Sequence, residues 1–306
     1  MLAIMVLHGS PFTTVRRTGR SPGVSLWLVL ECVLNVSEGR RDEVLAALAG
    51  AAGPCLLDVH RDAGHHRAVL TLAGPRDLLD AGVRAVATET VALVDLRNHA
   101  GAHPRIGALD VVPWVSLTGW PLTDGSLAVA VDARDRFARW AGAALQLPCF
   151  LYGPERSLPE VRRTAWTSLR PDTGPSSPHP TAGAAAVGAR PALVAYNLWL
   201  RQPDLSVARS VAAAIRGPAV RALGLQVGTA VQVSCNLIAP WIVGPAAVYD
   251  AVATRVAVSR AEVVGLLPAD LLREVPRRRR PELDLDPSRT IEARLEEAGL
   301  DAAGDD

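Results

Sequence analysis

Two stretches of this chain carry the same order of strand-like and helix-like segments. Alternating apolar residues predict strands and a 3.6-residue apolar period predicts helices, in the order strand, helix, strand, strand, helix, strand. The first copy comprises the segments 24–36, 40–51, 55–60, 67–74, 75–91 and 108–117. This element order is typical of a split β-α-β unit.

The second copy comprises the segments 191–198, 204–216, 221–227, 229–237, 244–259 and 262–267. Between the copies, the pattern predicts a helix at 124–145, a strand at 148–152 and a loop-rich stretch to 183. We therefore predict an α+β protein with two similar ferredoxin-like βαββαβ subdomains that face each other across a cleft. A cleft of this kind is a common place for a substrate site.

Composition narrows the classes of function. The chain has 306 residues, 49% hydrophobic content and a net charge of +1, which suits one large or two ordinary domains and argues against general nucleic-acid binding. It contains no lysine, which excludes a Schiff-base lysine and a Walker-type phosphate loop. Any bound anion must therefore meet arginine forks, which suit carboxylates.

The cysteines and the termini indicate a soluble, cytoplasmic protein. Cys32, Cys55, Cys149 and Cys235 form no Cys-x-x-Cys pair and are expected to be buried free thiols. No apolar run is long enough to span a membrane, and the basic start of a signal peptide is missing. The four arginines at 277–280 are read either as a patch for an acidic or nucleic-acid partner or as a solvated loop before a last helix capped by Ser288, and we favour the loop.

The segment 101–113 (GAHPRIGALDVVP) holds the strongest candidate for chemistry. It places His103 beside Arg105, with Pro104 restricting the backbone, in a loop that enters an apolar strand. A histidine held this way transfers protons near neutral pH, although a turn histidine bonded to the backbone is the simpler interpretation. His99 and His103 have the spacing of a helical metal pair, but glycine and proline between them disfavour a helix, so we predict no metal.

Several motifs, in the same order over residues 30–270, resemble those of the glutamate formimidoyltransferase (formiminotransferase) family. The stretch 101–111 is similar to the family's active-site signature, and 31–40 (ECVLNVSEGR) is similar to its opening strand and turn. Four further stretches continue the resemblance: 56–69, 170–190, 231–237 and 264–268. Six motifs in register are a specific signal, although each alone is weak.

The resemblance implies a one-carbon transferase of histidine degradation. It would move the formimino group from N-formimino-L-glutamate to N5 of tetrahydrofolate, giving 5-formiminotetrahydrofolate and glutamate. His103 would be the acid-base catalyst, tetrahydrofolate the co-substrate, and no metal would be needed. The expected partners are these small molecules, with no nucleic acid and no membrane, and a homodimer is left open.

The resemblance also assigns binding residues. Arg67 and Arg105 would meet substrate carboxylates, and Asn35 would hydrogen-bond the substrate. The segment 174–183 would be the folate loop, although its composition alone is typical of an interdomain linker. Its residues are Gly174, Pro175, Ser176, Ser177, Pro178, His179, Pro180, Thr181, Ala182 and Gly183.

The predicted domain boundaries follow from the repeated element order and from this resemblance. They are an N-terminal extension at 1–23, an N-terminal subdomain at 24–155, the linker and folate loop at 156–190, a C-terminal subdomain at 191–275, and a basic loop, helix and tail at 276–306. The cyclodeaminase domain of some relatives has no counterpart in the alignment. A formyltransferase that uses 5-formyltetrahydrofolate and glutamate is left open as an alternative of the same reaction class. Ala102, where members of the family have glutamate, and the altered folate loop also leave open a catalytically silent folate-binding homologue. A metal hydrolase that uses the histidines is a more distant alternative.

Overall fold

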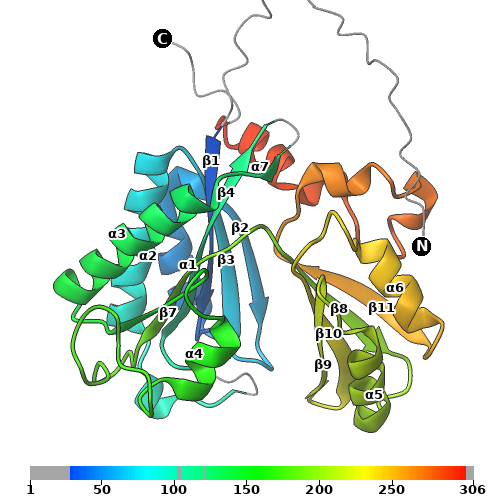
Figure 1. The fold of residues 1–306 in the computed structure, drawn as a ribbon, viewed down its shortest axis with the longest axis horizontal. Coiled ribbons are helices and arrows are strands. Elements are labelled where there is room, and N and C mark those ends of the chain that lie inside the picture. Colours follow the sequence, from blue (N-terminus) through cyan, green and yellow to red (C-terminus); the bar gives the residue numbers. More distant parts are fainter. Residues whose placement is uncertain (1–27, 102–104, 120–121, 301–306) are drawn as a thin grey trace, which may run out of the picture.

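The computed structural model describes residues 28–101, 105–119 and 122–300, which form a seven-stranded and a four-stranded sheet (Figure 1). Helices cover the outer face of each sheet, and the inner faces are turned toward each other. The α+β class predicted from the sequence is confirmed. In the described part of the chain, no helix is both long and apolar enough to cross a membrane.

The first copy of the repeat forms the core of the larger sheet. Its elements are β1 (Leu28–Val36), α1 (Asp42–Ala52), β2 (Leu56–Asp62), β3 (Arg67–Gly74), α2 (Arg76–Leu93) and β4 (Leu109–Thr118). The strands lie in the order β2-β3-β1-β4, and each neighbouring pair is antiparallel.

The second copy forms the smaller sheet. Its elements are β8 (Val194–Leu200), α5 (Leu205–Ile215), β9 (Val220–Val227), β10 (Ala230–Leu237), α6 (Pro245–Ala253) and β11 (Val258–Val264). The strand order is β9-β10-β8-β11, which is the same neighbour relation as in the first copy. The repeat predicted from the sequence is therefore present in both the element order and the strand order.

The stretch between the copies extends the larger sheet. It contains β5 (Thr123–Asp124), α3 (Leu127–Ala144), β6 (Cys149–Tyr152), α4 (Leu158–Thr164) and β7 (Ala185–Ala189). Strand β7 lies between β4 and β6 and is parallel to both. Helices α1–α3 cover the outer face of the larger sheet, and α5 and α6 cover that of the smaller one, whereas α4 packs on part of the larger sheet's inner face, over β6 and β7. The segment 156–190, predicted to be linker and loop, thus includes a short helix and an interior strand. The prediction failed there because a run of alanine and glycine carries almost no strand signal.

The helix predicted at 244–259 is too long. Helix α6 ends at Ala253, and strand β11 begins at Val258, four residues before the predicted start. Val248, Val252 and Val256 recur every four residues, as in a helix, but from Val258 onward the chain pairs with β8. Pairing with a neighbouring strand has overridden the local pattern, as is common for strand residues.

Each sheet and the helices that cover it form a unit with its own apolar core; the first unit contains the larger sheet and the second the smaller one. A third apolar cluster joins the first unit to the C-terminal part of the chain. Helix α2 packs Leu79, Val83 and Val86 at helical spacing against the larger sheet. The joining cluster includes Val29 and Leu117 of the first unit, and Leu266 and the residues Ile291 and Leu295 of α7 (Ile291–Glu297) from the C-terminal part. All four cysteines are buried and free, as predicted.

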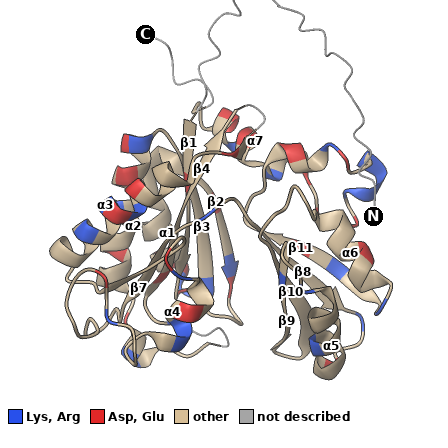
Figure 2. Ribbon diagram, viewed as in Figure 1, with Lys and Arg blue, Asp and Glu red and all other residues tan. Residues whose placement is uncertain are grey.

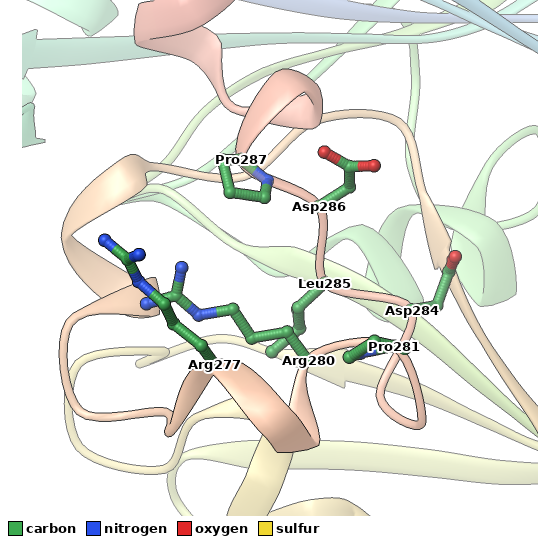
Figure 3. Close-up of a pocket in the computed structure, with 7 residues that line it drawn as sticks. All are labelled: Arg277, Arg280, Pro281, Asp284, Leu285, Asp286 and Pro287. Carbon is green, nitrogen blue, oxygen red and sulfur yellow. The ribbon is translucent and has the colours of Figure 1, made fainter.

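The four-arginine run forms a short 3-10 turn after β11. Arg279 pairs with Asp250 at 2.6 Å, and Arg280 donates to the carbonyls of Leu272 and Val275. Arg277 and Arg280 line a pocket of about 600 Å³ together with two aspartates and two prolines (Figure 3). The last helix is capped by Thr290, so the predicted cap at Ser288 is wrong.

Charged residues of both signs are interspersed over the helices and loops (Figure 2). The run of arginines sits among acidic partners, which agrees with the solvated-loop interpretation. The guanidiniums of Arg279 and Arg280 are both engaged, with Asp250 and with the carbonyls of Leu272 and Val275.

Gly107 and Gly183 allow two backbones to meet at the start of β4. The N–H of Ala108 donates to the carbonyl of Ala182, and the N–H of Ala184 donates to the carbonyl of Ile106. A Cβ at Gly107 would overlap the carbonyl of Ala184, and Gly183 has a φ of +69°. Only glycine suits both positions.

We therefore expect Gly107→Ala to lower the free energy of unfolding by about 3 kcal/mol or more, because backbone must move to admit the methyl group. Gly50→Ala is the matched control. It lies in α1 with no atom within 4 Å of its would-be Cβ, and alanine there should add about 0.5–1 kcal/mol. Denaturant unfolding of both variants tests this, and equal effects would contradict the close approach at residue 107.

Candidate functional site

A buried carboxylate organises one end of the larger sheet. Asp110 is fully buried near the start of β4, and its Oδ2 accepts from Arg67 Nη1 and Arg162 Nη2, both at 2.7 Å. Its Oδ1 accepts from the N–H of Ile106 at 2.8 Å. One carboxylate thus ties strand β3, helix α4 and the loop before β4 together.

A shift in strand register explains why Asp110 points to this side. Asn35 on β1 pairs with Val111, but the next residue, Val36, pairs with Leu109, so Asp110 has no partner on β1. Such a bulge re-aims a side chain relative to the strand alternation. Asp110 consequently shares the inner face of the sheet, on which α4 packs, with Asn35 and Arg67.

Charge compensation keeps Asp110 ionised. Burial by itself raises the pKa of this carboxyl, but the guanidiniums of Arg67 and Arg162 and the Ile106 N–H hold the pKa below its ordinary value. Two guanidiniums on one carboxylate leave a net positive charge at this point of the sheet.

Arg67 donates hydrogen bonds to the side chains of Asp110 and Asn35. The Oδ1 of Asn35 accepts from Arg67 Nε at 3.1 Å and from Nη2 at 2.9 Å, while its Nδ2 donates to the carbonyl of Val33. The structure therefore brings the predicted pair Asn35 and Arg67 together. It also shows that the amide oxygen of Asn35 is engaged with Arg67.

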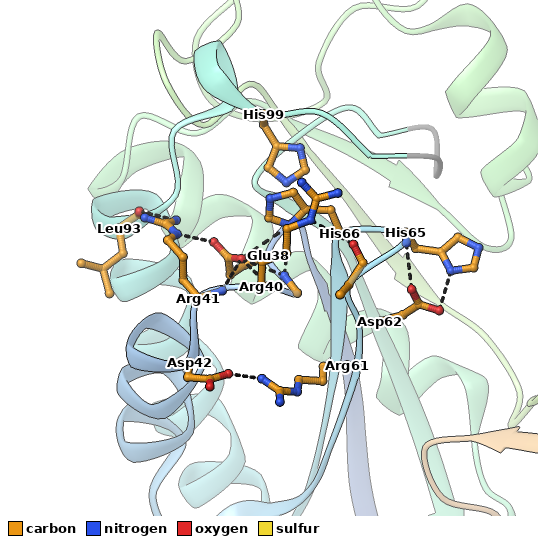
Figure 4. A network of polar contacts seen from close by, with 12 residues as sticks. Glu38, Arg40, Arg41, Asp42, Arg61, Asp62, His65, His66, Leu93 and His99 are labelled. Atoms are coloured by element: carbon orange, nitrogen blue, oxygen red, sulfur yellow. Dashed lines mark hydrogen bonds and ion pairs between the residues drawn. The ribbon is translucent and has the colours of Figure 1, made fainter. Parts of the chain in front are cut away.

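Arg105, the third predicted binding residue, lies against a pair of stacked histidines. The rings of His66 and His99 have centroids 3.9 Å apart and planes 28° apart. The Arg105 Nη1 lies 2.6 Å from Nδ1 and 3.0 Å from Nε2 of His99, and Nη2 donates to the carbonyl of His65 at 3.3 Å. Figure 4 shows His99 stacked over His66 at the turn between β2 and β3.

The predicted catalyst His103 lies outside the described residues. Its described neighbours in sequence are Gly101 and Arg105, and a Cβ at Gly101 would meet the carbonyl of His65 and the guanidinium of Arg105. The ends of the segment that carries His103 are therefore fixed beside the β2–β3 turn. Asp62, at the end of β2, pairs with His65 Nδ1 at 2.8 Å.

Glu38 anchors the loop between β1 and α1 next to these histidines (Figure 4). Its Oε1 accepts from the backbone N–H groups of Gly39, Arg40 and Arg41, and its Oε2 accepts from Arg41 Nε at 2.6 Å. The side chain is 1% exposed. Although burial raises the pKa of Glu38, these hydrogen bonds outweigh it and lower the pKa to about 2.

The predicted folate loop remains on the first unit. At its start, Thr173 pairs with Cys149, and at its end Gly183 pairs with Gly107. Within it, His179 Nδ1 accepts from the N–H groups of Thr181 and Ala182. Because both ends are bonded to the larger sheet, this stretch does not tether one unit to the other. Its return arm lies beside Ile106, one residue from Arg105.

Sequence reasoning missed four groups of this site: Asp110, Arg162, the histidine pair and Glu38. The motif that carries Asp110 was recognised, but a strand residue followed by valines gives no sign of a bulge. Arg162 was hidden in a helix that the pattern did not predict. In the described part of the chain, no three His, Cys, Asp or Glu side chains are grouped so as to hold a metal ion.

Comparison with known protein families places the site residues within one family domain. The profile of the formiminotransferase domain, N-terminal subdomain, matches residues 29–190. This range ends just after β7 and includes every site residue described above. The chain belongs to the formiminotransferase family. It is therefore a one-carbon transferase by family.

Formiminotransferase relatives match the chain over different lengths. A glutamate formimidoyltransferase of Streptococcus pyogenes is 32% identical over 278 residues, which is 81% of this chain and 91% of the relative. One from Thermoplasma acidophilum is 34% identical over 61% of this chain and 67% of its own length. A formimidoyltransferase-cyclodeaminase of Rattus norvegicus is 35% identical over 56% of this chain, but the match spans only 34% of that protein.

The low pKa of Glu38 predicts a pH dependence of stability. Because the folded-state pKa lies below the ordinary value of 4.5, the stabilisation is present above pH 4.5 and is lost as the pH falls toward 2. We expect Glu38→Gln to lower the free energy of unfolding at pH 7 by about 2 kcal/mol and to flatten its decline between pH 4.5 and 2. Glu43→Gln is the control, because Glu43 is exposed in the first turn of α1, which follows the loop that carries Glu38. An unchanged acid profile in Glu38→Gln would rule out this role.

Proposed function

We propose that this protein transfers the formimino group of N-formimino-L-glutamate to N5 of tetrahydrofolate, a step of histidine degradation. The observation that carries the proposal is the set of guanidiniums beside the His103 segment. Arg67 and Arg162 share Asp110, and Arg105 lies two residues from His103. A dicarboxylate substrate matches this excess of fixed positive charge.

The reaction requires two proton transfers and no change of oxidation state. N5 of the folate attacks the amidinium carbon and loses a proton, and the tetrahedral intermediate then expels the glutamate nitrogen, which gains one. We assign both transfers to His103, because an imidazole with an ordinary pKa near ~6.5 accepts and donates protons at neutral pH. Arg67 and Arg105 bind carboxylates in this scheme, and Asn35 holds Arg67 in place.

Tetrahydrofolate is the co-substrate in this proposal, and 174–183 is the loop that contacts it. Two observations support this role. The loop is attached to the first unit at both ends, and its return arm lies beside the residues that precede Asp110. Ser176 and Ser177 at its tip are exposed, which leaves their hydroxyls accessible to a ligand. His179 shapes the loop through its Nδ1.

The formyltransferase remains the second candidate within the same class of reaction. A formyl donor offers a neutral carbonyl carbon, whereas a formimino donor offers a cationic amidinium carbon. The test supplies the purified protein with each donor and acceptor pair and follows the folate product by ultraviolet absorbance. The proposal predicts 5-formiminotetrahydrofolate from formiminoglutamate. Product only from 5-formyltetrahydrofolate and glutamate would favour the formyltransferase, and tight folate binding without turnover would favour a silent homologue.

His103→Ala should reduce the turnover number by roughly 10²- to 10⁴-fold, the usual contribution of a positioned acid-base group. Folate affinity should stay nearly unchanged, because the imidazole acts on the transferred protons. Steady-state kinetics and calorimetric folate titration give the two readouts. His60→Gln is the control variant. His60 lies on β2, and its Nε2 is 3.7 Å from Oε1 of Glu262 on β11. Wild-type turnover in His103→Ala would exclude the mechanism.

A further inference from the structure

We propose that His99, stacked on His66, is a positioning residue that fixes the Arg105 guanidinium for binding a carboxylate. The inference rests on the proposed function in one respect, because that function makes Arg105 a ligand for the substrate. Neither the family comparison nor the sequence motifs assign a role to this histidine pair.

His99 offers Arg105 an acceptor in either neutral form. The Arg105 Nη1 is within hydrogen-bond distance of both ring nitrogens of His99, and each neutral tautomer leaves one of them unprotonated. A protonated ring would offer no acceptor and would place a second cation beside the guanidinium. The carbonyls of His65 and His66 lie on the same guanidinium, at 3.3 and 3.5 Å. Within the described part of the chain, Arg105 is thus oriented by the carbonyls of His65 and His66 and by the ring of His99.

The surroundings keep the histidine pair neutral. Burial has the largest effect on His99, and Arg105 and His66 act in the same direction. A hydrogen bond to the Ser37 backbone and the charge of Glu38 oppose them, and the pKa of His99 falls to about 4. Burial also lowers the pKa of His66, with Arg40, Arg41 and Arg105 acting in the same direction and Glu38 opposing them. The one N–H of Gly39 is shared between Glu38 Oε1 at 2.9 Å and His66 Nδ1 at 3.2 Å, and Glu38 Oε1 itself lies 3.5 Å from that ring nitrogen.

His66 in turn fixes the ring of His99. The contacts of His66 Nδ1 with Gly39 N and Glu38 Oε1 place the ring of His66 against the loop that Glu38 anchors, and His99 stacks on that ring. The chain of contacts runs from Glu38 through His66 and His99 to Arg105. A guanidinium held in this way needs less ordering when it binds a carboxylate, which favours affinity.

The kinetic test compares His99→Leu with His99→Gln. Leucine removes the acceptor, whereas the glutamine amide oxygen retains one for Arg105. We expect His99→Leu to raise the KM for formiminoglutamate roughly tenfold with little change in kcat, and His99→Gln to restore most of the loss. Arg97→Gln is the matched control, because Arg97 is exposed on the turn before His99 and pairs only locally with Asp95. An unchanged KM in His99→Leu would overturn the inference.

A double-mutant cycle separates positioning from general damage to the loop. If His99 acts through Arg105, then His99→Leu should have little further effect on KM once Arg105→Gln is present. Additive losses would mean that His99 acts by another route and would overturn the inference. Equal losses in the Leu and Gln variants, accompanied by lower melting temperatures, would also overturn it, because a purely structural role predicts that pattern.

A third measurement decides the inference even if the protein does not transfer a formimino group. Nuclear magnetic resonance titration of labelled histidine should place the pKa of His99 near 4 in the wild type. In Arg105→Gln it should rise toward the ordinary value of 6.5, because a neighbouring cation is gone. An unchanged titration in Arg105→Gln would overturn the contact. Failure of the wild type to produce 5-formiminotetrahydrofolate would instead overturn the proposed function alone.

Discussion

The site depends on one fully buried carboxylate. Asp110 accepts from Arg67, Arg162 and the N–H of Ile106, which belong to a strand, a helix and a loop far apart in sequence. Burying an ion is costly unless partners compensate it, and here two guanidiniums do so. The position of α4, the entry into β4 and the orientation of Arg67 are all linked to this carboxylate.

The distribution of charge around Asp110 suits an anionic ligand. Two guanidiniums share one carboxylate, and Arg105 adds a third near the same end of the sheet. The nearby carboxylate of Glu38 is taken up by three backbone N–H groups and Arg41. The neutral histidines beside Arg105 orient it without adding charge. Because the chain contains no lysine, every side chain with a permanent positive charge is an arginine, whose planar guanidinium is able to bind a carboxylate bidentately.

The sequence predicted the repeated fold because strand and helix periods are clear in both copies. It failed at β7, where small residues form an interior strand through partners on both sides, and at the end of α6, where pairing with β8 overrode a helical period. These are tertiary effects that no local pattern carries.

The candidate site was predicted in part. Asn35, Arg67 and Arg105 were found because they stand in or beside recognisable motifs, and the structure brings Asn35 and Arg67 into contact. Asp110 was not found, because its side chain reaches the site through a register shift that depends on β1. The role of His99 was not found either, because a stack with His66 joins residues 33 positions apart. His103 and its role stay a prediction.

The most direct test of the central claim is the free energy of unfolding of Asp110→Asn at pH 7. Removing the carboxylate leaves two partly buried guanidiniums without their counter-charge, so we predict a loss of about 3–5 kcal/mol. Asp42→Asn gives the reference, because Asp42 pairs with Arg61 on the exposed surface and such pairs contribute about 0–1 kcal/mol. A loss in Asp110→Asn no larger than that in Asp42→Asn would contradict the account.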